Sequence, residues 1–324
     1  MSRKIFVWLL ATVLLTTVSP TEAQQPKKIP LIGYLTTGSP FLASPNRDAF
    51  REGLRQLGYV EGQNIIIEYR YGENSNERLP DLAADLVRLK VNIIVAGGTE
   101  AIRAAKKATG TIPIVMGISS DPLGSGLVES LARPGGNVTG LSAMSPELSG
   151  KRLELFREAF PKIRRPAVLW YTASNAAFKE TQAAAQALGL RILSLQVRRP
   201  EDLDRAFALV TRERSDGLIP ISSAFLSANR KRILEFAKKN KLPAIYPNEL
   251  YVEDGGLMSY AASIQDSFRR AAVYVDKILK GRTPSDLPVE QPMKFEFVIN
   301  LKTAKQIGVT IPPNVLVRAD KVIR

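Results

Sequence analysis

The sequence predicts an α/β fold of two Rossmann-like lobes, each built on a parallel central sheet, joined by a hinge. Three observations support this fold class. From residue 29 onward, short apolar runs alternate with amphipathic stretches, the pattern of β-α units around a parallel sheet. The series breaks near residues 141–146 and then starts again. With 324 residues, the chain is also long enough to enclose two hydrophobic cores.

The first series of elements runs to about residue 141. Its strands are predicted as short apolar runs followed by small polar residues, and its helices as apolar residues three or four positions apart. Leu79, Leu82, Leu86 and Leu89 form such a stripe. The predicted elements are strands at 29–35, 64–71, 92–96, 112–117 and 138–141 and helices at 50–57, 79–89 and 100–108.

The second series opens at Ser145. A serine cap followed by Pro146 at the first helical position predicts a helix that ends at about Phe160. The segments after it repeat the same alternation of strand and helix. The predicted elements are strands at 167–171, 191–197, 217–221, 243–246 and 257–261 and helices at 178–188, 201–212, 228–239 and near 249.

The last elements decide how the lobes are joined. A helix is predicted over Ser267–Leu279, followed by a strand over Phe295–Asn300 and a helix through Ile307. The 267–279 helix is expected to return to the first lobe, because more than one connection makes a hinge that closes without unravelling. The predicted division is a first lobe of 29–143 plus about 262–282 and a second of 144–261 plus about 283–324.

Residues 1–23 have the pattern of a cleaved signal peptide. Arg3 and Lys4 precede the apolar run Ile5–Val18, and Ala23 offers a small residue at the cleavage site. The run is shorter than the roughly 20 residues that cross a bilayer, which disfavours an anchor. No cysteine is present to carry a lipid. We therefore expect a soluble periplasmic protein that is not a lipoprotein and does not span the membrane after cleavage.

The composition excludes several kinds of chemistry. The chain has no histidine and no cysteine, which removes serine–histidine triads, thiol nucleophiles and the usual zinc and haem ligands. No nucleotide-binding P-loop pattern is present either. The net charge of +14 is dispersed in short groups, not gathered in a basic arm that would bind nucleic acid. We expect no enzyme, no metal site, no cofactor and no nucleic-acid partner.

Small polar residues follow the strands of both lobes. Ligands of open α/β sheets bind beyond the carboxyl ends of the strands, so two facing lobes predict a cleft between them. A helix after Gly97-Gly98 would favour a carboxylate or phosphate at its amino end, with Thr99 as its cap. The candidate ligand-binding residues are Thr36, Ser39, Gly98, Thr99, Glu100, Ser120, Asp121, Tyr171, Ser174, Asn175, Ser222, Ser223, Asn248, Glu249 and Tyr260.

Within this set, the two tyrosines are candidates to wall off an aromatic group, and Asp121 and Glu249 are candidates to pair with an ammonium. A second interpretation stays open for each residue. Serine, threonine, asparagine and glycine are also the ordinary residues of βα turns and helix caps. Asp121-Pro122 is compatible with a simple turn, and each tyrosine with a place in the core.

The chain resembles the bacterial ABC-transporter substrate-binding proteins of the family that includes tryptophan- and tyrosine-binding members. The resemblance covers nearly all of the chain after the leader and implies a type I periplasmic-binding-protein fold. It rests on Ser120-Asp121-Pro122-Leu123 with Gly126-Leu127-Val128, Pro134-Gly135-Gly136-Asn137-Val138-Thr139-Gly140-Leu141, Ser145-Pro146-Glu147-Leu148-Ser149-Gly150-Lys151-Arg152, and Phe297-Val298-Ile299-Asn300-Leu301-Lys302-Thr303-Ala304 through Ile311-Pro312-Pro313.

The resemblance implies a pocket that includes Thr99 and Glu100, Ser120 and Asp121, Ser174 and Asn175, Ser222 and Ser223, and Glu249. Two departures stand out. Amino-acid-binding relatives carry a Thr-Pro turn where this chain has Glu100, and often Asp-Asn where it has Ser222-Ser223. Because Ser222 stands where those relatives often have an aspartate, the sequence gives less support for binding of an amino-acid ammonium group.

The function expected from the sequence is capture of a small organic ligand, amino-acid-like or an aromatic or organic acid. Its implied partners are an ABC permease of the inner membrane with a cytoplasmic ATPase. One alternative is a module that reports the same ligand to a membrane receptor. Another is an exported hydrolase that would use the carboxylates of Asp121 and Glu249.

Overall fold

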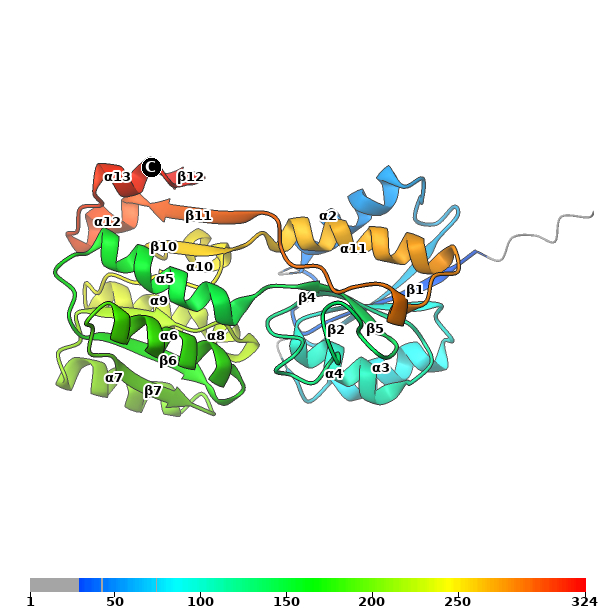
Figure 1. Ribbon diagram of the computed structural model, residues 1–324, viewed down its shortest axis with the longest axis horizontal. Helices are drawn as coiled ribbons and strands as arrows, with labels where there is room; N and C mark the ends of the chain where they lie inside the picture. The colour runs from blue at the N-terminus through cyan, green and yellow to red at the C-terminus, as the bar shows by residue number, and fades with distance from the viewer. Residues whose placement is uncertain (1–28, 42, 74) are drawn as a thin grey trace, which may run out of the picture.

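The computed structural model describes residues 29–41, 43–73 and 75–324. Two α/β lobes lie side by side, as the sequence predicts (Figure 1). The predicted leader at 1–23 lies outside the described residues. In the part of the chain that is described, no helix combines the length and apolar character needed to cross a membrane.

The first lobe is a five-stranded parallel sheet in the order β2-β1-β3-β4-β5. Its central strand, β3, is buried along its whole length, because the apolar Ile93–Gly97 run has helices on both sides. Helices α3 and α4 cover one face and α2 covers the other (Figure 1). The elements are β1 (Leu31–Thr36), α2 (Ser44–Gln56), β2 (Ile66–Tyr71), α3 (Leu79–Arg88), β3 (Ile93–Gly97), α4 (Thr99–Ala108), β4 (Ile114–Ser119) and β5 (Val138–Ser142).

Helix α11 (Ile264–Leu279) packs on the first lobe beside α2, as expected from the sequence. Phe268 fills the space that the missing side chains of Gly97 and Gly117 leave on the sheet, since a Cβ atom at Gly117 would lie 2.4 Å from its ring. Gly53 of α2 lies against the backbone of Arg269. The return of this helix therefore depends on three glycines that give it room.

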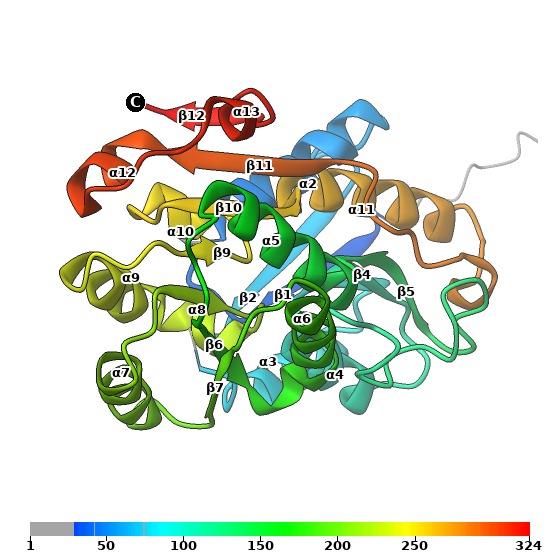
Figure 2. The ribbon, with the colours of Figure 1, turned by 60° about the vertical axis from the view of Figure 1, so that its left-hand side comes forward.

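The second lobe has two sheets, of strand order β7-β6-β8 and β9-β10-β11-β12, linked by a bridge between Leu218 and Ala244. Helices α5 and α6 lie on one face, with α7, α9 and α10 on the other (Figure 2). The elements are α5 (Ser145–Ala159), β6 (Pro166–Tyr171), α6 (Asn175–Ala187), β7 (Leu193–Val197), α7 (Asp202–Arg212), β8 (Gly217–Pro220), α8 (Ala224–Ala228), α9 (Arg230–Lys239), β9 (Ile245–Tyr246), α10 (Glu249–Glu253), β10 (Met258–Ala262), β11 (Phe295–Asn300), α12 (Leu301–Ile307), α13 (Pro313–Leu316) and β12 (Lys321–Ile323).

Three local features differ from the prediction. Strand β11 runs antiparallel to β10, so this sheet is mixed. The chain between these strands passes through the first lobe, so the usual right-handed crossover does not set their direction. The predicted 228–239 helix is preceded by a separate short helix, α8. Helix α13 and strand β12 have too few apolar residues to be recognised in the sequence.

The expected capping roles of Ser145 and Thr99 are corrected by the structure. Ser145 is buried inside the first turn of α5, and Met144 stands before it in the left-handed region at φ 49°. Gly98, at φ 94°, precedes α4, and Thr99 is the first residue of that helix. Proline still marks the start of α5. A proline in the first turn is compatible with a cap one residue earlier than predicted.

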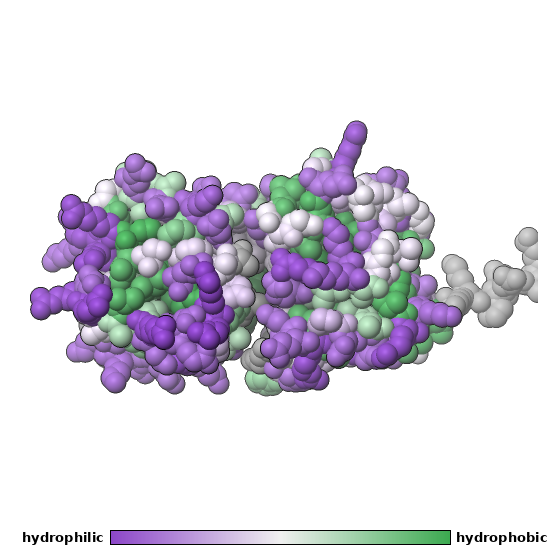
Figure 3. Space-filling model, turned by 90° about the horizontal axis from the view of Figure 1, so that it is seen from below, coloured by the Kyte–Doolittle hydropathy of each residue, from purple (hydrophilic) through white to green (hydrophobic). Residues whose placement is uncertain are grey.

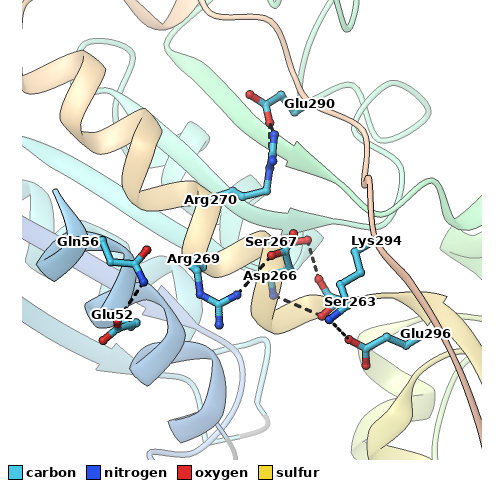
Figure 4. A network of polar contacts seen from close by, with 10 residues as sticks. All are labelled: Glu52, Gln56, Ser263, Asp266, Ser267, Arg269, Arg270, Glu290, Lys294 and Glu296. Atoms are coloured by element: carbon cyan, nitrogen blue, oxygen red, sulfur yellow. Dashed lines mark hydrogen bonds and ion pairs between the residues drawn. The ribbon is translucent and has the colours of Figure 1, made fainter. Parts of the chain in front are cut away.

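Three connections join the lobes and run side by side. They lie between β5 and α5, between β10 and α11, and after Glu290, where the chain leaves the first lobe for β11. The Ser142 amide donates to the Glu290 carbonyl at 2.9 Å, and the Ser263 amide donates to the Lys294 carbonyl at 3.1 Å. Figure 4 shows the start of α11 with Ser263, Lys294 and the Arg270–Glu290 ion pair at this junction.

The segment after α11 stays on the first lobe further than the boundary expected near residue 282. The Thr139 hydroxyl donates to the Leu287 carbonyl at 2.5 Å, and the Val289 amide donates to the Leu131 carbonyl at 2.7 Å. Both contacts are to the first lobe. The return to the second lobe falls between Glu290 and Phe295.

We predict that Gly53→Ala destabilises the protein. The new Cβ atom would lie 2.3 Å from the Arg269 carbonyl oxygen, which belongs to the backbone and has little freedom to move. Overpacking of this kind costs about 1–3 kcal/mol, whereas helix propensity alone would favour alanine by about 1 kcal/mol. The sign of the change in melting temperature therefore reports whether α11 packs there. Gly110→Ala, with open space around its Cβ, is the control.

Candidate ligand-binding cleft

A cavity of about 220 Å³ lies between the two lobes and is bordered by both. Figure 3 shows the notch between the lobes on the side opposite the three connections. The surface of the cavity is more apolar than polar, although about half of the lining residues are polar or charged. The lining residues used below are Asn76, Gly98, Thr99, Glu100, Ile118, Ser120, Asp121, Leu148, Arg152, Tyr171, Ser174, Ala176, Ser222, Ser223, Phe225, Asn248 and Ile264.

The first lobe contributes the carboxyl ends of β3 and β4. Gly98 lets the chain turn sharply into α4, and the Thr99 hydroxyl lies 3.4 Å from both the Ser119 hydroxyl and the Ser120 amide. The Asp121 carboxylate accepts from the Gly124 amide at 2.8 Å, so it also shapes the turn that follows β4. Both interpretations of Asp121 thus hold in the structure: it sets a turn and it borders the cavity.

The second lobe contributes an aromatic wall and three serines. The rings of Tyr171 and Phe225 stack at 5.2 Å with an interplanar angle of 19°. The Ser174 hydroxyl donates to the Ser222 carbonyl at 2.9 Å. Ser223 caps α8, because its hydroxyl oxygen accepts from the Leu226 amide at 3.1 Å. The two interactions fix the loops that surround the aromatic wall.

Arg152 borders the cavity from α5 and was not among the residues expected from the sequence. It is 2% exposed and is the largest fully buried side chain. Its Nε donates to the Tyr260 carbonyl at 2.9 Å and its Nη1 to the Ser149 hydroxyl at 3.1 Å. It forms no ion pair with any residue the structure describes. Burial lowers the pKa of this guanidinium to about 10, so it remains charged at neutral pH.

Asn248 also borders the cavity with an unpaired group. The side chain is 9% exposed, and its Oδ1 atom is buried without a hydrogen-bond partner among the described residues. Buried polar atoms are nearly always paired, because an unpaired one loses its hydration without compensation. Asn248 therefore places a buried acceptor, without a partner in the described chain, close to the cavity, although the oxygen itself is covered.

The structure brings ten of the fifteen predicted residues to the cavity and leaves five away from its lining: Thr36, Ser39, Asn175, Glu249 and Tyr260. Tyr260 stacks on Phe295 at 6.0 Å, and its carbonyl accepts from Arg152. Asn175 begins α6 and is exposed. The Tyr260 ring therefore packs against the core of the second lobe, which is the alternative that the sequence left open for it.

Glu249 begins α10 and lies beside Glu296 of β11. Burial raises the pKa of Glu249 to about 7, and the neighbouring Glu296 carboxylate adds to the shift. A hydrolase that uses Asp121 and Glu249 together would need both in the cavity. Glu249 is not among the residues that line it.

Two lobes with a cavity between them, and binding groups contributed by both, are the architecture of a solute-binding protein. A family model described as ABC transporter substrate binding protein matches residues 43–323. The chain belongs to this family, whose members are binding proteins and not enzymes. The family and the type I fold expected from the sequence are thereby confirmed.

Individual relatives agree with this membership. The chain is 27% identical over 265 residues to a tyrosine-binding protein of Clostridioides difficile, covering 81% of this chain and 76% of that protein. A solved domain of Streptococcus pneumoniae in complex with L-Trp has a TM-score of 0.84 at 26% identity, covering 91% and 99%. A conserved domain protein of Vibrio cholerae has a TM-score of 0.83 at 29% identity, covering 91% and 100%.

We predict that the pH dependence of stability reflects Glu249. Between about pH 4.5 and about 7 the folded chain keeps a proton on Glu249 that the unfolded chain has released, so the free energy of unfolding falls as pH rises. Glu249→Gln removes this loss. The variant is expected to melt a few degrees above the wild type at pH 8 and level with it at pH 4. Glu180→Gln is the control, because Glu180 is exposed on α6 and makes no ion pair among the described residues. Parallel melting curves for Glu249→Gln and wild type would contradict the assignment.

Proposed function

We propose that the chain is the extracytoplasmic solute-binding protein of an ABC importer. The observation that carries the proposal is the cavity bordered by both lobes, in which apolar and aromatic surface is combined with polar side chains from each lobe. Pockets for small ligands commonly have this composition and measure about 300–1,000 Å³. At about 220 Å³ this cavity is smaller than that range, which suits a small ligand.

The proposed ligand is a small organic molecule, amino-acid-like or an aromatic or organic acid. The stacked Tyr171 and Phe225 rings support a flat apolar group. The names of the relatives point to tyrosine and L-Trp, which are similar in size and also aromatic. The neutral Ser222-Ser223 turn does not supply a carboxylate for an ammonium group.

Closure of the two lobes on the ligand is the proposed mechanism. Three adjacent connections allow one lobe to rotate relative to the other while each keeps its own core. A ligand that touches both walls gains more contacts in the closed form than in the open form. Only that difference in affinity shifts the population toward closure.

The proposed partners are a membrane permease and its cytoplasmic ATPase. The chain would meet them after export directed by a leader at residues 1–23, which is then removed. We place the mature chain in the periplasm without a lipid anchor. The rival role is a module that reports the ligand to a receptor. Genes for a permease and an ATPase beside this one, and binding of the closed form to that permease, favour import; binding to a receptor domain instead favours sensing.

We predict that closure shortens the distance across the cavity. Asn76 and Ala176 border it from opposite lobes and are exposed, and the chain has no cysteine to compete with introduced labels. Spin labels at Asn76→Cys and Ala176→Cys are expected to move closer when a saturating ligand from a thermal-shift screen is added, as measured by pulsed electron resonance. Labels at Gln56→Cys and Lys107→Cys, both on the first lobe, should stay at a constant distance. Bound ligand with no change across the cavity would rule out closure but not binding.

We predict that Ser120→Ala weakens the same ligand without unfolding the protein. The Ser120 hydroxyl borders the cavity and makes no hydrogen bond within the described residues. Loss of one hydrogen bond, worth about 1 kcal/mol, raises Kd roughly fivefold. Calorimetry measures the change, with Ser285→Ala on the outer surface as the control. An unchanged Kd would remove Ser120 from the binding site.

A further inference from the structure

Arg152 is a buried positive charge at the cavity, and no buried carboxylate among the described residues pairs with it. Arg152 is 2% exposed, and no carboxylate pairs with it in the part of the chain that the structure describes. A buried charge is normally paired, because removal from water costs several kcal/mol per ion. Two neutral acceptors, the Tyr260 carbonyl and the Ser149 hydroxyl, compensate only part of that cost.

The donors of Arg152 are only partly used. A guanidinium has five N–H groups, and two hydrogen bonds are formed by Nε and Nη1. Nη2 makes no hydrogen bond within the described residues. The guanidinium is anchored to Ser149 of α5 and to the Tyr260 carbonyl of β10, and Arg152 is among the residues that border the cavity.

The first lobe does not offer a competing place for an anion. The amino end of α4 borders the cavity, but Glu100 lies in its first turn and Asp121 lies nearby in the lining. Glu100 is held by Arg103 through both oxygens, at 2.7 and 2.8 Å, so this pair is already neutral. Asp121 keeps a negative charge that would repel a second anion from the amino end of α4.

On the basis of the proposed function, we propose that Arg152 is the anion-binding residue of the cleft and that it takes the carboxylate of a small organic acid. The carboxylate accepts from the free Nη2 and from the remaining N–H of Nη1. The apolar body of the acid lies against Tyr171 and Phe225. An ammonium group is not required, since the Ser222-Ser223 turn is neutral.

A matched set of probes tests this assignment. L-Tyrosine carries both charges, 3-(4-hydroxyphenyl)propionate keeps only the acid, tyramine keeps only the ammonium, and 3-(4-hydroxyphenyl)propionamide has neither. The same set is extended with the acid and amide forms of benzoate and phenylacetate. Melting temperature and calorimetry are measured on the full mature protein at neutral pH. We expect acids to raise the melting temperature and their amides and tyramine not to do so.

Arg152→Gln removes the charge, and Arg152→Lys keeps it. Loss of a buried partner of a bound carboxylate is expected to raise the Kd of the acids roughly 30-fold or more, while lysine restores part of the affinity without the planar fork. Lys151→Gln is the matched control, because this substitution also removes one positive charge from α5. Lys151 pairs with Glu154 and does not line the cavity. The unliganded Arg152→Gln protein should stay folded, since the loss of an unpaired buried charge offsets part of the lost packing and hydrogen bonding.

The outcomes separate this proposal from the general function. Equal binding of an acid to wild type and Arg152→Gln overturns the role of Arg152, as does failure of every acid to exceed its amide. Binding of tyramine or an amide alone would overturn the carboxylate class but leave a solute-binding protein. Absence of binding by any amino acid, acid, amine or sugar would count against the proposed function itself. Unfolding of both Arg152 variants would assign the residue to structure and would also overturn the proposal.

Discussion

Three side-by-side chain crossings are the constraint on which the cleft depends. They hold the carboxyl ends of β3 and β4 opposite those of β6 and β8, where the loops carry the small polar residues. Backbone hydrogen bonds between Ser142 and Glu290 and between Ser263 and Lys294 keep the crossings together. A single linker would leave the orientation of the lobes free. With three, rotation about the junction is the motion that leaves both cores intact.

The sequence predicts the elements and the edge of each sheet at which the cavity forms. Buried parallel strands are short apolar runs, and this signal depends on local composition alone. The direction in which a residue points is a different matter. Tyr260 follows the last strand of its series as predicted, yet its ring packs on Phe295, because β11 pairs with β10 from a distant part of the chain. Glu249 meets Glu296 for the same reason.

Arg152 was missed because an arginine on a helix is ordinarily solvated. The sequence contains part of the information that places Arg152 at the cavity. The stretch from Ser145 to Arg152 resembles the family, and Arg152 follows Leu148 by four positions on a predicted helix. Leu148 is buried, so the same face of α5 had to carry Arg152 inward. A charged residue in register with the buried stripe of a helix deserves the same notice as a polar residue after a strand.

The electrostatics of the cleft limit the total charge of its ligand. Among the described residues that line the cavity, Arg152 of the second lobe is a positive charge without an ion pair, and Asp121 of the first lobe is a carboxylate without one. Glu100 is neutralised by Arg103. A dicarboxylate would place its second anion toward Asp121 and meet repulsion at low effective dielectric. Under the proposed role of Arg152, a monoacid places its carboxylate there and brings no second anion near Asp121. Phosphate esters and dicarboxylates are therefore disfavoured under that proposed role, while an aromatic acid and the amino acid of the same shape both match the charges of the cleft.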